Sequence, residues 1–189
     1  MNGKIKWIAR TAMLLALVVV VQYIGKIVGG GSQLSQYIAG SLVNLILVTA
    51  AALTGPFGGA AVALVSPLFA QIIGIGPGSV IPMMIPVIML GNLAIVLVMH
   101  AFFRVTRSRQ KGKIFINYAG AVTASVVKFG VLFLTSSYIV KPFFVPADVP
   151  PVKADTIIAM FSYPQLVTAL IGSIIAVSIL PTILKAIKK

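Results

Sequence analysis

Lys128 is the residue of this chain whose type and position most strongly suggest chemistry. It lies near the middle of an apolar stretch, Asn117 to Val140, whereas the other Lys and Arg residues lie at or beyond the ends of such stretches. A charge at bilayer depth is costly, so it normally faces a bundle interior or a wet cavity and indicates a functional site. No Asp or Glu occurs in any apolar stretch. A ligand carboxylate, phosphate or carbonyl would supply the missing partner, although backbone carbonyls or snorkelling remain alternatives.

Other polar residues inside the apolar stretches are biased towards one side of the membrane. Ser125, Lys128 and Ser136 are spaced by three and eight residues, which places them on one face of a helix. Hydrogen bonding between helices is the alternative explanation for Ser66, Asn92 and Gln71. We expect a pocket open to the outside, with the following substrate-binding candidates: Gln33, Gln36, Tyr37, Asn44, Gln71, Asn92, Lys128, Ser136, Tyr163 and Gln165.

Enzymatic chemistry finds little support in the residue types. Metal-assisted hydrolysis needs several His or carboxylate ligands, whereas the chain has one His, two acidic residues and no Cys. A Ser–Lys dyad, of Ser125 or Ser66 with Lys128, is the one conceivable nucleophilic arrangement. The glycine-rich segments lack the spacing of a P-loop or a dinucleotide fingerprint. We therefore expect no catalytic residue, no metal site and no cofactor.

The elements that must position these residues are transmembrane helices. Of the 189 residues, 59% are hydrophobic and 9% are charged, and the mean hydropathy is +1.10. An average soluble domain has about 25% charged residues. A bilayer core requires about 20 apolar residues per helix. The sequence predicts an all-α integral membrane protein, one compact domain over residues 1–189, with six spans at about 8–28, 38–54, 57–75, 82–104, 117–140 and 160–187.

The basic residues indicate the orientation. With the N-terminus inside, eleven Lys and Arg residues flank the spans on the cytoplasmic side, and three lie outside. This distribution follows the positive-inside rule, so we expect a plasma-membrane protein with both termini in the cytoplasm. The net charge of +13 is explained by contact with the lipid bilayer and its anionic inner leaflet rather than by nucleic acid.

The predicted loops on the outer side suggest a cover for the pocket. The first, Gly29 to Tyr37, has three glycines followed by amide and aromatic side chains and could close over a ligand as a gate. The longest, Lys141 to Asp155, contains four prolines and both acidic residues. The sequence leaves open whether this second loop is an ordered lid or a loose extended segment.

Small residues cluster near the cytoplasmic ends of the first three predicted spans. Ala9, Ala12 and Ala16 share one face of the first span, and the third begins with Gly58, Gly59 and several alanines. Small residues allow helices to approach closely. They indicate either tight packing within the bundle or a smooth docking surface for another membrane protein.

Taken together, the chain resembles the substrate-binding S-components of energy-coupling factor (ECF) vitamin transporters. The resemblance covers its size, its six spans, its basic N-terminus, the Ala12-x-x-x-Ala16 motif and the Gly55-Pro56-x-Gly58 turn before a small-residue span. It implies that the alanine face docks on an ECF transmembrane coupling subunit, which works with two cytoplasmic ATPase subunits. It also implies capture of a vitamin outside and its release inside by toppling of the S-component, with ATP hydrolysed by the partners.

The substrate and two rival functions stay open at this point. Lys128 and the amides suit an anionic or amide-rich vitamin such as pantothenate, and the long outer loops, rich in small residues, favour a corrinoid such as cobalamin. A small non-transporting membrane protein that only self-associates is one rival. A stand-alone secondary carrier is the other, although the spans lack the acidic or His relays that proton-driven carriers use.

Overall fold

Six long apolar helices make up most of the chain. The computed structural model describes residues 3–29, 33–75, 77–107 and 113–187. Within these ranges, six helical segments are long and apolar enough to cross a membrane, and no strand occurs. This confirms the predicted all-α, six-span architecture. The long helices are α1 (Gly3–Gly29), α2 (Gln33–Leu53), α3 (Gly55–Ile73), α4 (Met84–Arg107), α5 (Lys113–Thr135) and α8 (Tyr163–Ile187).

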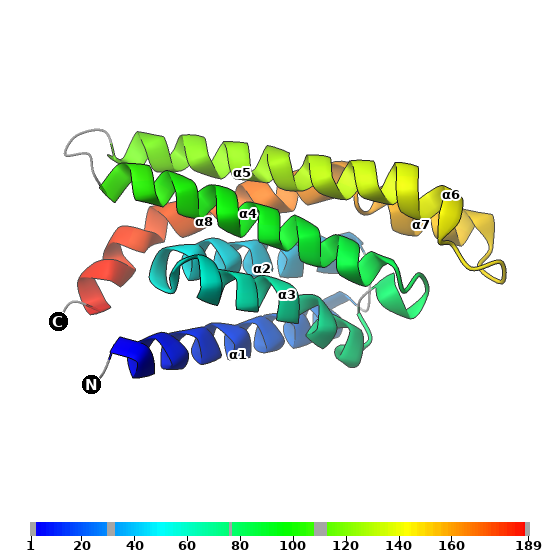
Figure 1. The fold of residues 1–189 in the computed structure, drawn as a ribbon. Helices are drawn as coiled ribbons and strands as arrows, with labels where there is room; N and C mark the ends of the chain where they lie inside the picture. Colours follow the sequence, from blue (N-terminus) through cyan, green and yellow to red (C-terminus); the bar gives the residue numbers. More distant parts are fainter. Residues whose placement is uncertain (1–2, 30–32, 76, 108–112, 188–189) are drawn as a thin grey trace.

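The helices run side by side, and α1 begins at the same end of the bundle at which α8 ends (Figure 1). Helix α2 is central, since it packs against α1, α3, α4 and α8. The opposite end of the bundle carries the short elements η1 (Pro77–Ser79), η2 (Ser136–Val140), α6 (Lys141–Phe143) and α7 (Pro151–Ala159). We call this the lid end, and the other the terminal end.

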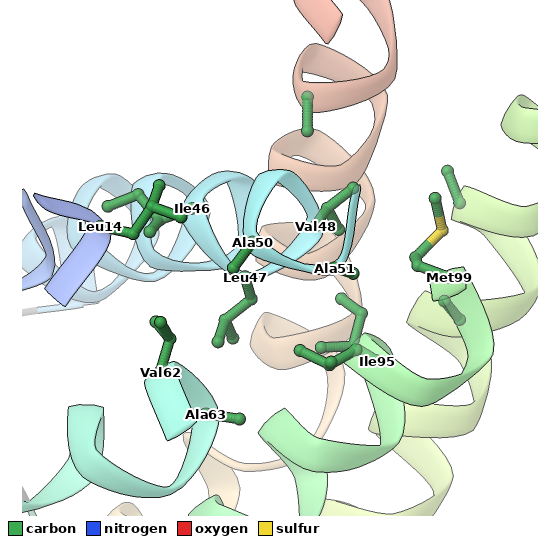
Figure 2. Packing of buried hydrophobic residues seen from close by; sticks show 14 of the residues in the cluster. Leu14, Ile46, Leu47, Val48, Ala50, Ala51, Val62, Ala63, Ile95 and Met99 are labelled. Atoms are coloured by element: carbon green, nitrogen blue, oxygen red, sulfur yellow. The ribbon is translucent and has the colours of Figure 1, made fainter. Parts of the chain in front are cut away.

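The core surrounds α2. Leu47 and Ala51 of α2 are fully buried and lie near Val62 of α3 and Ile95 of α4 (Figure 2). Burying such side chains stabilises a water-soluble core through the hydrophobic effect, but between helices in lipid the gain comes mainly from close packing. Outward-facing positions are correspondingly apolar: Leu17, Leu97 and many others are exposed on the surface of the bundle.

Glycine determines how α2 and α3 meet. Gly55 has a φ of +72°, a left-handed conformation that glycine adopts without steric cost, and it starts α3 directly after α2. A Cβ at Gly59 would lie 2.6 Å from the Val96 side chain of α4. Trp7 Nε1 donates a hydrogen bond of 2.8 Å to the carbonyl oxygen of Thr54, which ties α1 to this turn. For Gly58 and Gly59, both buried, the small residues serve packing within the bundle.

The segment from Lys141 to Asp155 is ordered. Together with the rest of α7 and the connection to α8, it covers the lid end of the bundle, and we call this part the lid. Helix α5 continues through the π-helical η2 into α6, and α7 then leads back to the start of α8. The Lys141 Nζ and an Asp155 carboxylate oxygen are 2.9 Å apart, and both side chains are more than half exposed. An exposed ion pair of this kind contributes at most about 1 kcal/mol. The shape of the lid therefore depends mainly on apolar contacts of Ile158 and Phe161, which are buried in a second core cluster.

Candidate functional site

A cavity of about 340 Å³ lies inside the lid half of the bundle. The second half of α1, the first half of α2, the second half of α3 and the first half of α4 supply its walls. Helix α5 contributes Lys128, and the end of α7 and its connection to α8 supply Ile157, Met160 and Phe161 as a roof. Its volume lies within the range of about 300–1,000 Å³ that is typical of small-molecule sites.

Lys128 is buried at the inner wall of this cavity, with 3% of its surface exposed. Its Nζ donates hydrogen bonds of 2.6 Å to Asn44 Oδ1 and 2.7 Å to Asn92 Oδ1. Three helices, α2, α4 and α5, therefore meet at one ammonium group. Two amide oxygens solvate a buried cation in part, but they do not neutralise it.

The lysine also determines how both asparagine amides are turned. An ammonium group only donates hydrogen bonds, so each asparagine must present its oxygen to Lys128 and its nitrogen elsewhere. Asn92 Nδ2 then donates to Ser66 Oγ at 3.1 Å, with a longer contact of 3.4 Å to the Ala63 carbonyl. A chain of hydrogen bonds thus links α3, α4, α5 and α2 behind the cavity.

Three glutamines carry further polar atoms into the same cavity. Gln22 Nε2 donates to the carbonyl oxygen of Ser66 at 2.9 Å, and Gln36 Nε2 donates to that of Met160 at 2.6 Å. The second of these bonds ties α2 to the lid. The Oε1 atoms of Gln22, Gln36 and Gln71 are buried and have no hydrogen-bond partner in the described structure. A buried acceptor without a partner costs free energy, so such atoms often mark the place of a ligand or water.

Six of the ten predicted site residues line the cavity: Gln36, Asn44, Gln71, Asn92, Lys128 and Gln165. Tyr37, Ser136 and Tyr163 do not line it. The Tyr163 side chain is 67% exposed. Ser136 is buried, but its Oγ donates to the Phe133 carbonyl at 3.3 Å. Gln33 is the first residue of α2, and its side chain lies outside the described part of the structure.

Two polar cavity residues, Gln22 and Ser66, are not among the predicted site residues. Gln22 is the one amide side chain within the first predicted span, and its residue type is a signal that could have found it. In the structure it is 5% exposed. Ser66 acts mainly through its backbone and hydroxyl oxygens, which accept from Gln22 and Asn92. The contribution of a backbone carbonyl cannot be read from residue type.

The structure does not assemble the serine–lysine arrangement that the sequence leaves conceivable. Lys128 donates to two asparagines, and Ser125 Oγ donates to the Ala121 carbonyl at 2.7 Å. Among the described residues, no group of three or more His, Cys, Asp or Glu side chains could hold a metal ion. The cavity is thus suited to binding, through one cation, amides and an apolar wall.

The alanine face of α1 lies on the surface of the bundle. Ala9, Ala12 and Ala16 are all exposed and lie in the half of α1 nearer the terminal end. For these three residues, packing within the bundle is the wrong interpretation of the small-residue pattern. What remains is a smooth strip, away from the cavity, that another membrane protein or lipid can cover.

Comparison with known families shows to which family the chain belongs. The family described as "ECF transporter, substrate-specific component" matches residues 6–184, nearly the whole chain. The chain belongs to this family. No curated protein and no solved structure matches the sequence.

Membership as an ECF substrate-specific component, or S-component, confirms the family predicted from the sequence. Such a component is a substrate-binding subunit of a transporter. Membership in the family therefore implies that the chain docks on an energising module and binds a small-molecule substrate. With its six apolar helices, the S-component is a multi-pass membrane protein.

Proposed function

We propose that this S-component captures a small water-soluble vitamin on the outside of a prokaryotic plasma membrane and releases it inside. The observation that carries the proposal is the cavity beside Lys128, a buried cation without an acidic neighbour, with three unpartnered glutamine oxygens around the same space. In this orientation both termini are cytoplasmic and the lid end faces outwards, as the positive-inside rule favours.

The size of the cavity favours the smaller of the two substrates considered. About 340 Å³ suits a vitamin of the size of pantothenate, whereas a corrinoid macrocycle is several times larger. A corrinoid would require a wide opening of the lid, including loss of the Gln36–Met160 hydrogen bond. The cavity and its polar groups therefore support a small vitamin as substrate.

Energy for transport comes, in this proposal, from partner subunits. Among the described residues that line the cavity, none is acidic, and Lys128 is the one charged residue. Docking of the exposed Ala9, Ala12 and Ala16 strip on a transmembrane coupling subunit would place the S-component against a module with two cytoplasmic ATPases. Toppling of the docked component within the membrane would then turn the cavity from the outer to the inner side. The S-component itself binds no nucleotide and catalyses no reaction.

The first test is to identify what the protein binds. The S-component is purified alone in mild detergent from cells grown in rich medium and denatured, and released small molecules are identified by mass spectrometry. We expect one vitamin at a near-stoichiometric amount. An empty protein that also fails to bind any vitamin of a panel would contradict the proposal and favour a non-transporting membrane protein.

A second measurement separates the proposal from a stand-alone carrier. Uptake of the identified vitamin is compared in cells with and without the ECF ATPases. Uptake should require the ATPases. Uptake at an unchanged rate in cells lacking every ECF ATPase would support a secondary carrier instead.

A further inference from the structure

We propose that the substrate of this cavity is a small monocarboxylate that also carries two or three hydroxyl or N–H donors. This inference rests on the proposed vitamin-binding function and specifies the chemistry of the ligand. It follows from counting the hydrogen-bonding groups that the protein leaves unused around the cavity.

The anion is required by Lys128 and Asn44. The ammonium group has three N–H donors, and two of them are used by Asn44 and Asn92. The Asn44 oxygen is held by the lysine, so its amide nitrogen is directed elsewhere, and Asn44 lines the cavity. One ammonium N–H and one amide nitrogen are thus available to a ligand acceptor. A carboxylate has the geometry to accept from two donors at once, and it would neutralise the buried charge.

The glutamines favour hydrogen-bond donors on the ligand. The Nε2 groups of Gln22 and Gln36 are held by the carbonyl oxygens of Ser66 and Met160. Each Oε1 is therefore fixed as an acceptor, and it is buried without a partner. Gln71 brings a third amide with an unpartnered Oε1. It lies beside Gly78, where a Cβ would come within 2.8 Å of that oxygen. Only N–H or O–H groups of a ligand, or water, can satisfy these atoms.

The remaining walls limit the rest of the ligand. Val43, Ile85, Ile88 and Phe161 supply apolar surface, which suits a short aliphatic or saturated body. A cationic vitamin such as thiamin would meet Lys128 without a countercharge. A neutral polyol such as pyridoxine would supply donors but no anion, and nicotinate would supply the anion but no donor. Pantothenate, with one carboxylate, two hydroxyls and one amide N–H, satisfies both requirements, and biotin, with one carboxylate and two N–H groups, satisfies them with fewer donors.

The test compares an acid with its matched alcohol on the purified wild-type S-component, by titration calorimetry. Pantothenate and panthenol differ only in the carboxylate, and biotin and biotinol form a second pair. We expect the acid of at least one pair to bind about 10- to 100-fold more tightly than its alcohol, as the loss of a charge-assisted hydrogen bond would give. Equal binding of acid and alcohol in the pair that binds would overturn the proposal.

A variant of Lys128 tests whether the preference for the acid over the alcohol depends on this residue. In Lys128→Met the preference for the acid should disappear, whereas Lys153→Met, which removes an exposed lysine away from the cavity, should keep it. An acid preference that survives in folded Lys128→Met would overturn the assignment to Lys128. If Lys128→Met does not fold, the comparison of acid and alcohol on the wild type decides alone.

The glutamines are tested with Gln71→Leu, since the Gln71 side chain forms no hydrogen bond with the described part of the protein that the change would remove. Its affinity for pantothenate should fall more than its affinity for nicotinate, which has no donor to lose. Equal losses for both acids would contradict the role of donors. Tight binding of a neutral vitamin with no binding of any carboxylate would reject the substrate class but leave the vitamin-binding function standing. Failure of every vitamin in the panel would reject both.

Discussion

At the scale of single residues, the site is a buried cation that the protein solvates without neutralising. Lys128 is held by the oxygens of Asn44 and Asn92, and the two acidic residues of the chain, Asp148 and Asp155, do not line the cavity. Removing water from a charge costs free energy that only a close opposite charge offsets well. The folded protein already bears the cost of removing water from Lys128. A ligand anion that pairs with Lys128 offsets this cost, and the offset adds to its affinity.

The variant Asn92→Asp tests this argument by supplying the missing charge from the protein. The new carboxylate would lie against the Lys128 ammonium group, so an anionic ligand should lose about 10- to 100-fold in affinity, equivalent to about 1.5–3 kcal/mol. Thermal stability in detergent should not fall, because the buried cation gains a partner and the Ser66 hydroxyl, which accepts from Asn92 Nδ2 in the wild type, can donate to the new carboxylate instead.

A matched control for Asn92→Asp is Asn117→Asp, which adds the same charge on α5 at a position that does not line the cavity. Its ligand affinity should stay near that of the wild type. If Asn92→Asp bound an anionic ligand as tightly as the wild type does, the role of Lys128 as an anion partner would have to be abandoned.

The sequence predicts the depth of a site residue in the membrane better than the direction in which its side chain points. The depth of a residue in the membrane can be read from its distance to the end of a span, and on that basis the sequence predicts that Lys128, Asn44 and Asn92 contribute to one pocket. The direction in which a side chain points requires the helix rotation, which packing decides. Ser136 shows the difference, because it is buried but does not line the cavity, and its Oγ donates to the Phe133 carbonyl instead.

At the scale of elements, the same limits apply to the ends and connections of helices. Six spans follow from hydropathy because a bilayer requires long apolar helices. The short helix α7 is not predicted, since Pro150 and Pro151 mark a break in the sequence, although Pro is also well tolerated in the first turn of a helix. The order of the lid arises from long-range contacts such as Gln36 to Met160, and local sequence does not encode them.

Close packing of α2 against α8 provides a prediction at this scale. A Cβ at Gly172 of α8 would collide with the Ser41 carbonyl oxygen and lie 2.8 Å from the backbone nitrogen of Leu45. Because backbone atoms cannot move aside as a flexible side chain can, Gly172→Ala should push the helices apart. We expect a loss of about 1–3 kcal/mol in stability, measured by unfolding in detergent.

The control for Gly172→Ala is Gly130→Ala on α5, where a Cβ would have no neighbour within 4 Å. Alanine favours the helix at such a site by up to about 1 kcal/mol, so this variant should be as stable as the wild type or more so. Equal destabilisation by both changes would show that contact with α2 is not what selects glycine at position 172.

At the scale of the whole molecule, the proposed binding site and the proposed docking surface lie in separate parts of the bundle. The cavity lies in the lid half, and the strip of Ala9, Ala12 and Ala16 lies on the outside of α1 nearer the terminal end. If the proposal holds, substrate capture and contact with the energising module should be alterable one at a time. A stand-alone carrier would have no need for such a smooth exposed strip.

The variants Ala12→Trp and Ala16→Trp test this separation. A bulky ring on the strip should prevent close approach of a coupling helix, so vitamin uptake by cells should fall to background while the purified variant keeps wild-type affinity for its ligand. Ala119→Trp is the control, since Ala119 is also exposed but lies on α5, and it should support normal uptake. Normal uptake with both α1 variants, or lost affinity with an intact complex, would contradict the assignment. Because neither alanine touches the cavity, loss of uptake with intact binding can arise only after capture, at docking or release.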